Sequence, residues 1–436
     1  MSVALALFAA LAAAQPAHAP EHRAIVEYRI KPGDTLFELG ARYFIRPEDY
    51  RIVQRMNRVS DPRRLPIGRI LRIPRRILRS EPVDGNVVAF RGNVVIAEGG
   101  AQRPAAMRAQ VREGMAVETG AKSFVTVELP DASRFSLPSN SRVGIAHLRR
   151  TLLTGEVERR FRVEKGRSDW DVTPGKSDPF SVETPVATTA VRGTGFRVTY
   201  SPDSDAMTVG VLEGRVAVTG PDAVTETALA AGTGAALRPN AQIVAGALLP
   251  APALERPGAA QKGEQLAFAA RAVSGASGYG FEIASDAGFI DRIAETKADT
   301  PEARFDGLPG GTYFVKATAF DANGVEGMAN IYGFERQLNT LDLDTPQADK
   351  AGGRKDYLFR WRGSGGGTVE YRFVLSRDEA GQDRLVDEAG LTRTNISISD
   401  LPSGVWYWRV WSIRYENGRH SETVSSPQKL QIGDPQ

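Results

Sequence analysis

The chain has 436 residues, enough for about three folded domains, and 42% of them are hydrophobic and 25% charged. This composition fits neither a disordered chain nor a membrane bundle, so we expect a soluble multidomain protein. The absence of cysteine excludes disulfides and thiolate metal centres, and the presence of only four histidines disfavours zinc sites and Ser–His–Asp triads. Carboxylate chemistry is the catalytic route that remains.

Charge is unevenly distributed along the chain. Residues 23–79 hold fifteen basic and six acidic side chains, a net charge of +9 in a chain whose total is +3. Such a cationic segment is attracted to polyanions such as nucleic acid, anionic lipid or an anionic cell-wall polymer. A solvated arginine-rich face is the alternative interpretation.

We expect the first 22 residues to be a signal peptide and a short leader. Residues 3–14 are an uninterrupted run of small and apolar residues, and a membrane-spanning helix needs about 20. Cleavage is expected after Ala14, with Ala19 as the alternative site. Because no Lys or Arg precedes the run, a buried N-terminal helix is the competing interpretation. No later run approaches membrane length, which predicts a mature chain without a transmembrane span.

The next segment, residues 28–74, predicts a small unit of two strands and two helices. An alternating strand ends at a Pro–Gly turn, after which Asp34 or Thr35 can cap a helix. Pro47 starts a second helix, and a closing strand spans residues 70–74. The expected order is strand, helix, helix, strand around one core.

The same segment resembles a LysM domain. The resemblance rests on Tyr28, the run Pro32-Gly33-Asp34-Thr35-Leu36, Asn57 and residues 68–74. It implies a βααβ fold that binds N-acetylglucosamine-containing glycans, peptidoglycan in bacteria, in a shallow groove between two loops. The glycan-binding residues that it implies here are Gly33, Asp34, Thr35, Leu36, Leu65, Pro66, Ile67 and Gly68.

These loops suit the chemistry of an acetamido sugar. Backbone groups of Asp34, Thr35 and Ile67 can hydrogen-bond the sugar amide, and Leu36, Pro66 and Ile67 can contact its methyl group. Alternatively, Asp34 and Thr35 only cap the helix and Leu36 belongs to the core. Both interpretations can hold, because capping and ligand contact use different faces. A single shallow groove predicts weak binding.

Short alternating runs replace helical periodicity from residue 86 onward. Each run is bounded by Gly, Pro, Asp or Asn, which predicts strands joined by tight turns. The clearest runs are at residues 125–129, 161–163, 196–200, 207–211 and 216–218. We expect an all-β domain, either a sandwich or a coiled array of short strands.

Several segments of this region resemble the periplasmic FecR domain. They are residues 113–120, 129–133, 164–167, 182–185, 192–196 and 211–216. The family's regulators pass a signal from an outer-membrane receptor to a sigma factor, and they need a cytoplasmic helical segment and a membrane span ahead of the domain. A signal peptide and a LysM module stand there instead, so we do not expect the sigma-factor role.

Paired carboxylates in this region are the candidates for catalysis or Ca²⁺ binding. Glu164 with Asp169 and Asp171 forms one group, and residues 203–205 form another. Such residues between strands are more often turn formers or solvated charges. The glycine run at residues 193–195 lacks the helix start that a phosphate loop requires. We therefore expect no catalytic residue, metal or cofactor, and no enzyme.

The C-terminal part repeats itself after a hinge rich in Ala, Pro and Gly at residues 247–260. Residues 279–283 align with 371–375 at an offset of 92, and the following strands align at an offset of 93. The pattern predicts two β-sandwich domains. The second, with its run at residues 401–410, resembles a fibronectin type III or related immunoglobulin-like module.

The aromatic strand of the second repeat has two faces. Trp406 and Trp408 point to one face, and Tyr407 and Trp411 point to the other. An exposed pair could stack on sugar rings, but we expect Trp406 and Trp408 to fill the core.

Together these features predict a multidomain, mainly β, exported and non-catalytic envelope protein of a Gram-negative bacterium. It binds peptidoglycan through the LysM module and presents the FecR-like domain to an outer-membrane or periplasmic protein, without nucleic acid. Two alternatives stay open: a soluble periplasmic sensor or co-receptor in FecR-type signalling, and a peptidoglycan hydrolase or its accessory. The expected domains are the signal segment 1–22, the LysM module 23–80, the FecR-like domain 84–250 and the sandwiches 251–340 and 345–433.

Overall fold

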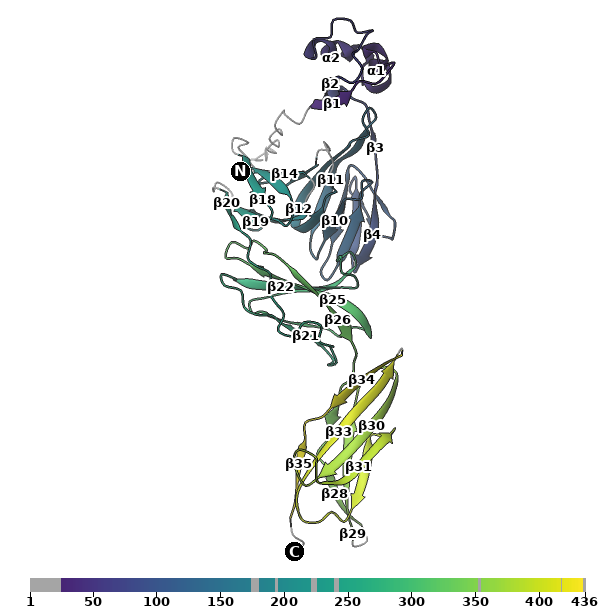
Figure 1. Ribbon diagram of the computed structural model, residues 1–436, viewed down its shortest axis with the longest axis vertical. Coiled ribbons are helices and arrows are strands. Elements are labelled where there is room, and N and C mark those ends of the chain that lie inside the picture. The colour runs from purple at the N-terminus through teal and green to yellow at the C-terminus, as the bar shows by residue number, and fades with distance from the viewer. Residues whose placement is uncertain are drawn as a thin grey trace, which may run out of the picture.

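The structure is a computed structural model that describes residues 25–173, 180–192, 195–220, 226–238, 243–351, 354–416 and 418–433. Four units lie in a row, with a small helical module at one end and a β-sandwich at the other (Figure 1). Each unit has its own apolar core. The mainly β, multidomain class is therefore confirmed. The expected signal peptide lies outside the described residues, and no described helix is long and apolar enough to span a membrane.

The N-terminal module has the expected βααβ order. Its elements are β1 (Ile25–Arg29), α1 (Leu36–Tyr43), the 3₁₀ turn η2 (Pro47–Asp49), α2 (Tyr50–Met56), β2 (Ile70–Pro74) and the 3₁₀ turn η3 (Arg75–Ile77). The strands β1 and β2 pair antiparallel. Leu36, Phe44 and Val53 are fully buried between the helices and this hairpin.

Asn57 fixes the end of α2 to the closing strand. Its side-chain amide donates to the carbonyls of Val53 (2.8 Å) and Arg72 (2.7 Å), and its Oδ1 accepts from the Arg72 N–H (2.7 Å). The contact explains why asparagine is suited to this position, because the side chain must donate and accept toward the same strand.

The second unit is all-β, as expected. Its strands pair in two sets that share one long strand, and together they connect into a closed barrel. The strands are β3 (Ser80–Pro82), β4 (Gly85–Arg91), β5 (Val94–Glu98), β6 (Ala101–Pro104), β7 (Gln110–Val111), β8 (Met115–Thr119), β9 (Phe124–Glu128), β10 (Arg134–Leu137), β11 (Arg142–Thr151), β12 (Val157–Asp171), β13 (Phe180–Glu183), β14 (Thr188–Arg192), β15 (Gly195–Ser201), β16 (Ala206–Val211), β17 (Arg215–Thr219), β18 (Glu226–Ala230), β19 (Thr233–Leu237) and β20 (Val244–Ala247). We refer to this unit as the barrel.

The long strand β12 connects two sides of the barrel. Its first part pairs with β11 and β13, and its last residues pair with β10 and β15. Gly166 lies at the change, with φ +76° and with Ser141 so close that a Cβ on Gly166 would clash. A glycine is therefore required where the strand passes from one side to the other.

The last two units are β-sandwiches, which confirms the predicted repeat. In the first, β21 (Leu266–Ala269) and β24 (Glu302–Phe305) face the sheet of β23 (Arg292–Ala298), β22 (Gly278–Ala284), β25 (Gly311–Phe320) and β26 (Asn330–Arg336). In the second, β27 (Asp342–Leu343), β29 (Arg354–Arg362), β28 (Gln347–Ala351) and β32 (Asn395–Ser399) face β31 (Arg384–Leu391), β30 (Thr368–Ser376), β33 (Gly404–Glu416), β34 (Arg419–Val424) and β35 (Gln428–Ile432). The aligned residues of β22 and β30 are all buried: Tyr279, Phe281, Ile283, Tyr371, Phe373 and Leu375.

The segment expected to be a hinge is packed instead. Leu248 donates its N–H to Gly232 of the barrel (2.9 Å), and the carbonyl of Leu249 accepts from Met328 of the first sandwich (2.8 Å). Farther along, Glu255 N–H donates to Ala269 (2.9 Å). The Ala, Pro and Gly content of this segment predicted a flexible backbone. That backbone is instead hydrogen-bonded to the units on both sides.

The two sandwiches are joined through Asn339, which is 1% exposed. Its amide donates to the carbonyls of Ser412 and Ser421 (both 3.0 Å), and its Oδ1 accepts from Arg414 Nε (3.2 Å). Its N–H also donates to Lys262 of the first sandwich (3.0 Å). One buried residue therefore links both sandwiches through its backbone and its side chain.

Candidate functional site

Pairing of β1 with β2 places two loops at the same end of the N-terminal module. Gly68 N–H donates to the Ile30 carbonyl (2.9 Å), and Ile30 N–H donates to Arg69 (3.0 Å). Arg29 Nη1 also donates to the Gly68 carbonyl (3.0 Å). The loop at residues 33–36 follows β1 and the loop at residues 65–68 precedes β2. The pairing of these two strands therefore fixes the positions of the loops relative to each other.

Asp34 shapes the first loop. Its Oδ2 accepts from the Lys31 N–H (2.7 Å) and from the Tyr28 hydroxyl (2.9 Å). Burial, together with this hydrogen bond to Asp34, raises the pKa of Tyr28 to about 12. The Asp34 carboxylate is thus used to hold the turn. A ligand at this loop would meet the peptide groups of the loop instead.

Thr35 is the N-cap of α1, as one of the two interpretations predicted. Its Oγ1 accepts from the Glu38 N–H (3.1 Å), which satisfies one of the free amides of the first turn. The neighbouring Leu36 has no exposed surface and belongs to the core, and its N–H donates to Pro62 (2.9 Å). Contact of the Leu36 side chain with a sugar methyl group is therefore not available in this conformation.

The second loop presents the apolar surface. Ile67 is 68% exposed, the largest exposure among the exposed large hydrophobic side chains that the structure describes, and Pro66 is also exposed. The glycines Gly33 (φ +88°) and Gly68 (φ +82°) have no heavy atom within 4 Å of the place where a Cβ would lie. The loops are therefore open to solvent at Gly33 and at Pro66 and Ile67, and Ile67 supplies the apolar surface there.

Two families match parts of the chain. Residues 28–74 match the LysM domain, and residues 115–217 match the FecR protein family. The chain carries a LysM domain followed by a FecR match that lies within the barrel, and we call the whole barrel the FecR region from here on. Both resemblances that the sequence motifs indicated are confirmed, and the LysM match covers both loops. No curated protein matches the chain.

Among solved structures, one from Parabacteroides distasonis is of a protein described provisionally as an anti-sigma factor. It is 22% identical with a TM-score of 0.26, and the match covers 30% of this chain and 59% of that one. Fibronectin(III)-like modules of CbhA from Clostridium thermocellum are 15% identical (TM-score 0.20; 42% and 92% covered). Domains FN1–FN3 of chicken CNTN1 are 12% identical (TM-score 0.22; 73% and 98% covered). At these scores the similarities support no conclusion about fold or function.

The carboxylates considered as an acid–base pair in the FecR region have other partners. Glu164 Oε2 accepts from Arg142 Nε (2.6 Å), and Asp205 Oδ1 accepts from the Tyr200 hydroxyl (2.7 Å). Asp169 is held by Arg167 (2.9 Å) and by Arg292 of the first sandwich. Within the described residues, no three Asp, Glu or His side chains group as a metal site would require. Residues 193–194 of the glycine run lie outside the described part.

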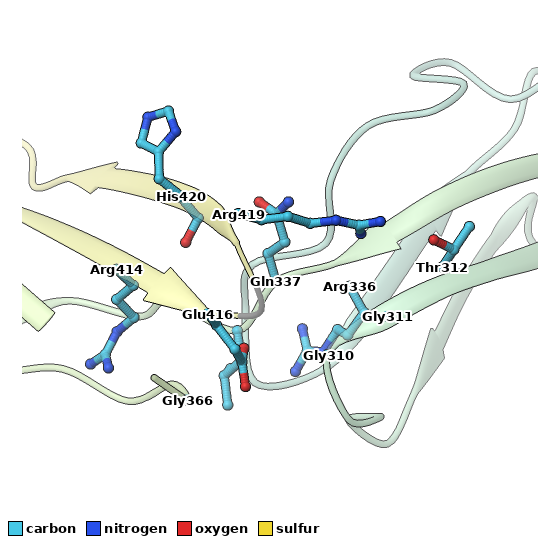
Figure 2. Close-up of a pocket in the computed structure, with 12 residues that line it drawn as sticks. Gly310, Gly311, Thr312, Arg336, Gln337, Gly366, Arg414, Glu416, Arg419 and His420 are labelled. Carbon is cyan, nitrogen blue, oxygen red and sulfur yellow. The ribbon is translucent and has the colours of Figure 1, made fainter. Parts of the chain in front are cut away.

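A polar cleft of about 250 Å³ lies between the two sandwiches (Figure 2). Glu416 extends toward Gly310 of the first sandwich and Gly366 of the second. The Arg336 guanidinium in its wall donates to Leu308 (3.1 Å) and to three further backbone carbonyls. Because the protein's own carbonyls occupy these donors, the Arg336 guanidinium has little hydrogen-bonding capacity left for a ligand in the cleft. The residues of this cleft form no local motif, so no sequence pattern predicts it.

The sequence also gave no sign of the contact between the FecR region and the first sandwich. Arg197 Nη1 donates to the Gly327 carbonyl (2.8 Å), and Arg91 forms a bidentate pair with Asp291 (2.9 and 2.8 Å). Thr126 Oγ1 donates to the carbonyl of Ile290 (2.7 Å). The first sandwich thus covers one side of the FecR region within the same chain.

Proposed function

We propose that this protein is an exported, non-catalytic component of the bacterial cell envelope. Its LysM domain holds peptidoglycan through N-acetylglucosamine units, and its FecR region contacts a periplasmic or outer-membrane protein. The open pair of loops at residues 33–36 and 65–68 is the observation that carries the glycan part of the proposal.

In the proposed complex the acetamido group lies between the two loops. The methyl group contacts Ile67 and Pro66, and peptide groups of Asp34, Thr35 and Ile67 exchange hydrogen bonds with the amide. The Leu36 side chain takes no part, because it is buried. One shallow site of this size gives weak binding, so that long glycan strands are held better than short ones in pull-downs.

The FecR region would receive its partner on a surface that the first sandwich leaves free. The strands β5, β8 and β11 pair side by side, and the residues that bond this sandwich, such as Arg91, Thr126 and Ser139, lie on other strands or in loops. Charged side chains line this surface in ion pairs, such as Arg142 with Glu118 (2.7 Å). A partner found there by crosslinking in cells would favour the periplasmic co-receptor role over a purely structural one.

The glycan proposal is tested by sedimentation with purified peptidoglycan. The variant Ile67→Ala is expected to lose about fivefold in retention, because it removes roughly 1 kcal/mol of apolar contact. Ile45→Ala is the matched control: Ile45 is 59% exposed and lies beyond the other end of α1. Equal retention of wild type and Ile67→Ala would refute this groove as the binding site.

The non-catalytic part has its own test. Wild-type protein incubated with labelled peptidoglycan should release no soluble fragment above the level of a heat-inactivated sample. Time-dependent release would overturn this part of the proposal and leave glycan binding intact.

A further inference from the structure

The LysM domain keeps its positive charge unneutralised. Residues 25–79 contain fourteen basic and six acidic side chains. Among the residues that the structure describes, one of these cations, Arg75, forms an ion pair, and its partner is Glu156 of the barrel (2.8 Å). Every other Lys and Arg of this stretch is exposed.

In the FecR region, by contrast, several cations form ion pairs. Arg142 lies between Glu118 (2.7 Å) and Glu164 (2.6 Å), and Lys165 pairs with Glu118 (2.7 Å). These cations are therefore neutralised by neighbouring carboxylates, as those of the LysM domain are not. Unpaired like charges on a module of this size repel one another, which destabilises the compact state unless a ligand neutralises them.

Some of the free cations border the glycan loops. Arg63 and Arg64 directly precede Leu65, and Arg69 directly follows Gly68. The turn before the loop is held by backbone contacts to Asp61, from Arg63 N–H to Oδ1 (2.9 Å) and from Arg64 N–H to the carbonyl (3.1 Å). Among the described residues, neither guanidinium group has a hydrogen bond or an ion pair, and both side chains are exposed, as Ile67 is.

An acetamido sugar is neutral and does not account for this charge. We propose that the LysM site selects aminoglycans that carry carboxylates, such as peptidoglycan with free stem-peptide carboxylates, over neutral ones. The inference rests on the proposed glycan binding and adds a second recognition element to the same groove. The sugar would lie against Ile67, and carboxylates on the same polymer would meet the planar guanidinium groups of Arg63, Arg64 and Arg69.

The test measures binding of the full chain to three probes. They are neutral hexa-N-acetylchitohexaose, soluble peptidoglycan fragments with free carboxylates, and the same fragments with their carboxylates amidated. Wild type should prefer the free-carboxylate fragments, and added salt should reduce that preference through screening. The variant Arg63→Ala/Arg64→Ala should lose about fivefold in affinity for these fragments and keep its affinity for chitohexaose.

The matched control is Arg256→Ala/Arg304→Ala. It removes the same charge from exposed positions of the first sandwich and should leave all three affinities unchanged. Equal binding of free and amidated fragments overturns the inference, while chitohexaose binding would still support the proposed function. Loss of binding to every glycan probe would instead remove the proposed function itself. Binding to duplex DNA or anionic vesicles as tight as to peptidoglycan overturns the inference too, because charge alone would explain it.

Discussion

Arg167 of β12 and Glu282 of β22 form an ion pair across the boundary between the FecR region and the first sandwich. Their Nη1 and Oε1 atoms lie 2.8 Å apart, and the side chains are 9% and 5% exposed. Lys316 pairs with the same carboxylate (2.8 Å). A charge buried in this way is stable only while its partners are present, so the two units depend on each other.

Removing the Glu282 carboxylate should make the FecR region and the first sandwich unfold less cooperatively. Glu282→Gln removes the carboxylate that pairs with Lys316 and takes one of its partners from Arg167, which keeps Asp169. We expect a loss of about 3 kcal/mol in the free energy of unfolding. Calorimetry should show the shared transition of the FecR region and first sandwich splitting or moving to lower temperature. The control Glu98→Gln breaks an exposed pair with Arg112, for which a change below about 1 kcal/mol is expected. A Glu282→Gln protein as stable as this control would contradict the prediction.

Acid should weaken the same interface. Burial by itself would raise the pKa of Glu282 and Asp169, but Arg167 and Arg292 lower both below their ordinary values of 4.5 and 3.8. A depressed folded-state pKa stabilises the protein above the unfolded value, and this stabilisation is lost as pH falls below it. The unfolding temperature should stay level above about pH 5 and fall steeply toward pH 3. Glu282→Gln should show a shallower fall; an equally steep one would assign the effect to other groups.

Alkali should unfold the LysM domain through Tyr28. Its folded pKa of about 12 lies above the ordinary value of 10.0, so its stabilising effect is complete below pH 10 and is lost as pH rises toward 12. Tyr28→Phe removes the hydrogen bond to Asp34 and should lower stability by about 1 kcal/mol at pH 8. Circular dichroism of the thermal transition at pH 8 and pH 11 measures both effects. If Tyr28→Phe keeps the full alkaline loss, Tyr28 is not its source.

The two tryptophan faces of β33 should respond differently to truncation. Trp406 and Trp408 are each 1% exposed, which confirms that they fill the core of the second sandwich, whereas Trp411 is partly exposed beside Arg372. Trp408→Ala should cost about 4 kcal/mol, and Trp411→Ala less than about half of that. Chemical denaturation measures both changes. Peptidoglycan retention should be unaffected by Trp411→Ala; a loss would show that this face stacks on sugar.

Local pattern was sufficient for the elements and for the loops of the LysM domain. Thr35 caps α1 because a hydroxyl before an apolar helical period is a local signal, and apolar alternation at residues 207–211 placed β16 and its buried face correctly. Arg167 and Glu282 gave no such signal, because their pairing depends on how two domains meet more than 100 residues apart. The packing of residues 247–260 was missed for the same reason. A composition rich in Ala, Pro and Gly predicts a flexible backbone, but it does not show that neighbouring units bond to the segment.

The buried Asn339 has a consequence for the dimensions of the whole molecule. Because Asn339 is bonded to both sandwiches, it restricts their rotation relative to each other. The ion pairs around Glu282 restrict rotation between the FecR region and the first sandwich in the same way. With its units in a row (Figure 1), the protein acts as a strut. The distance from the FecR region to the far end of the second sandwich is therefore expected to be nearly constant.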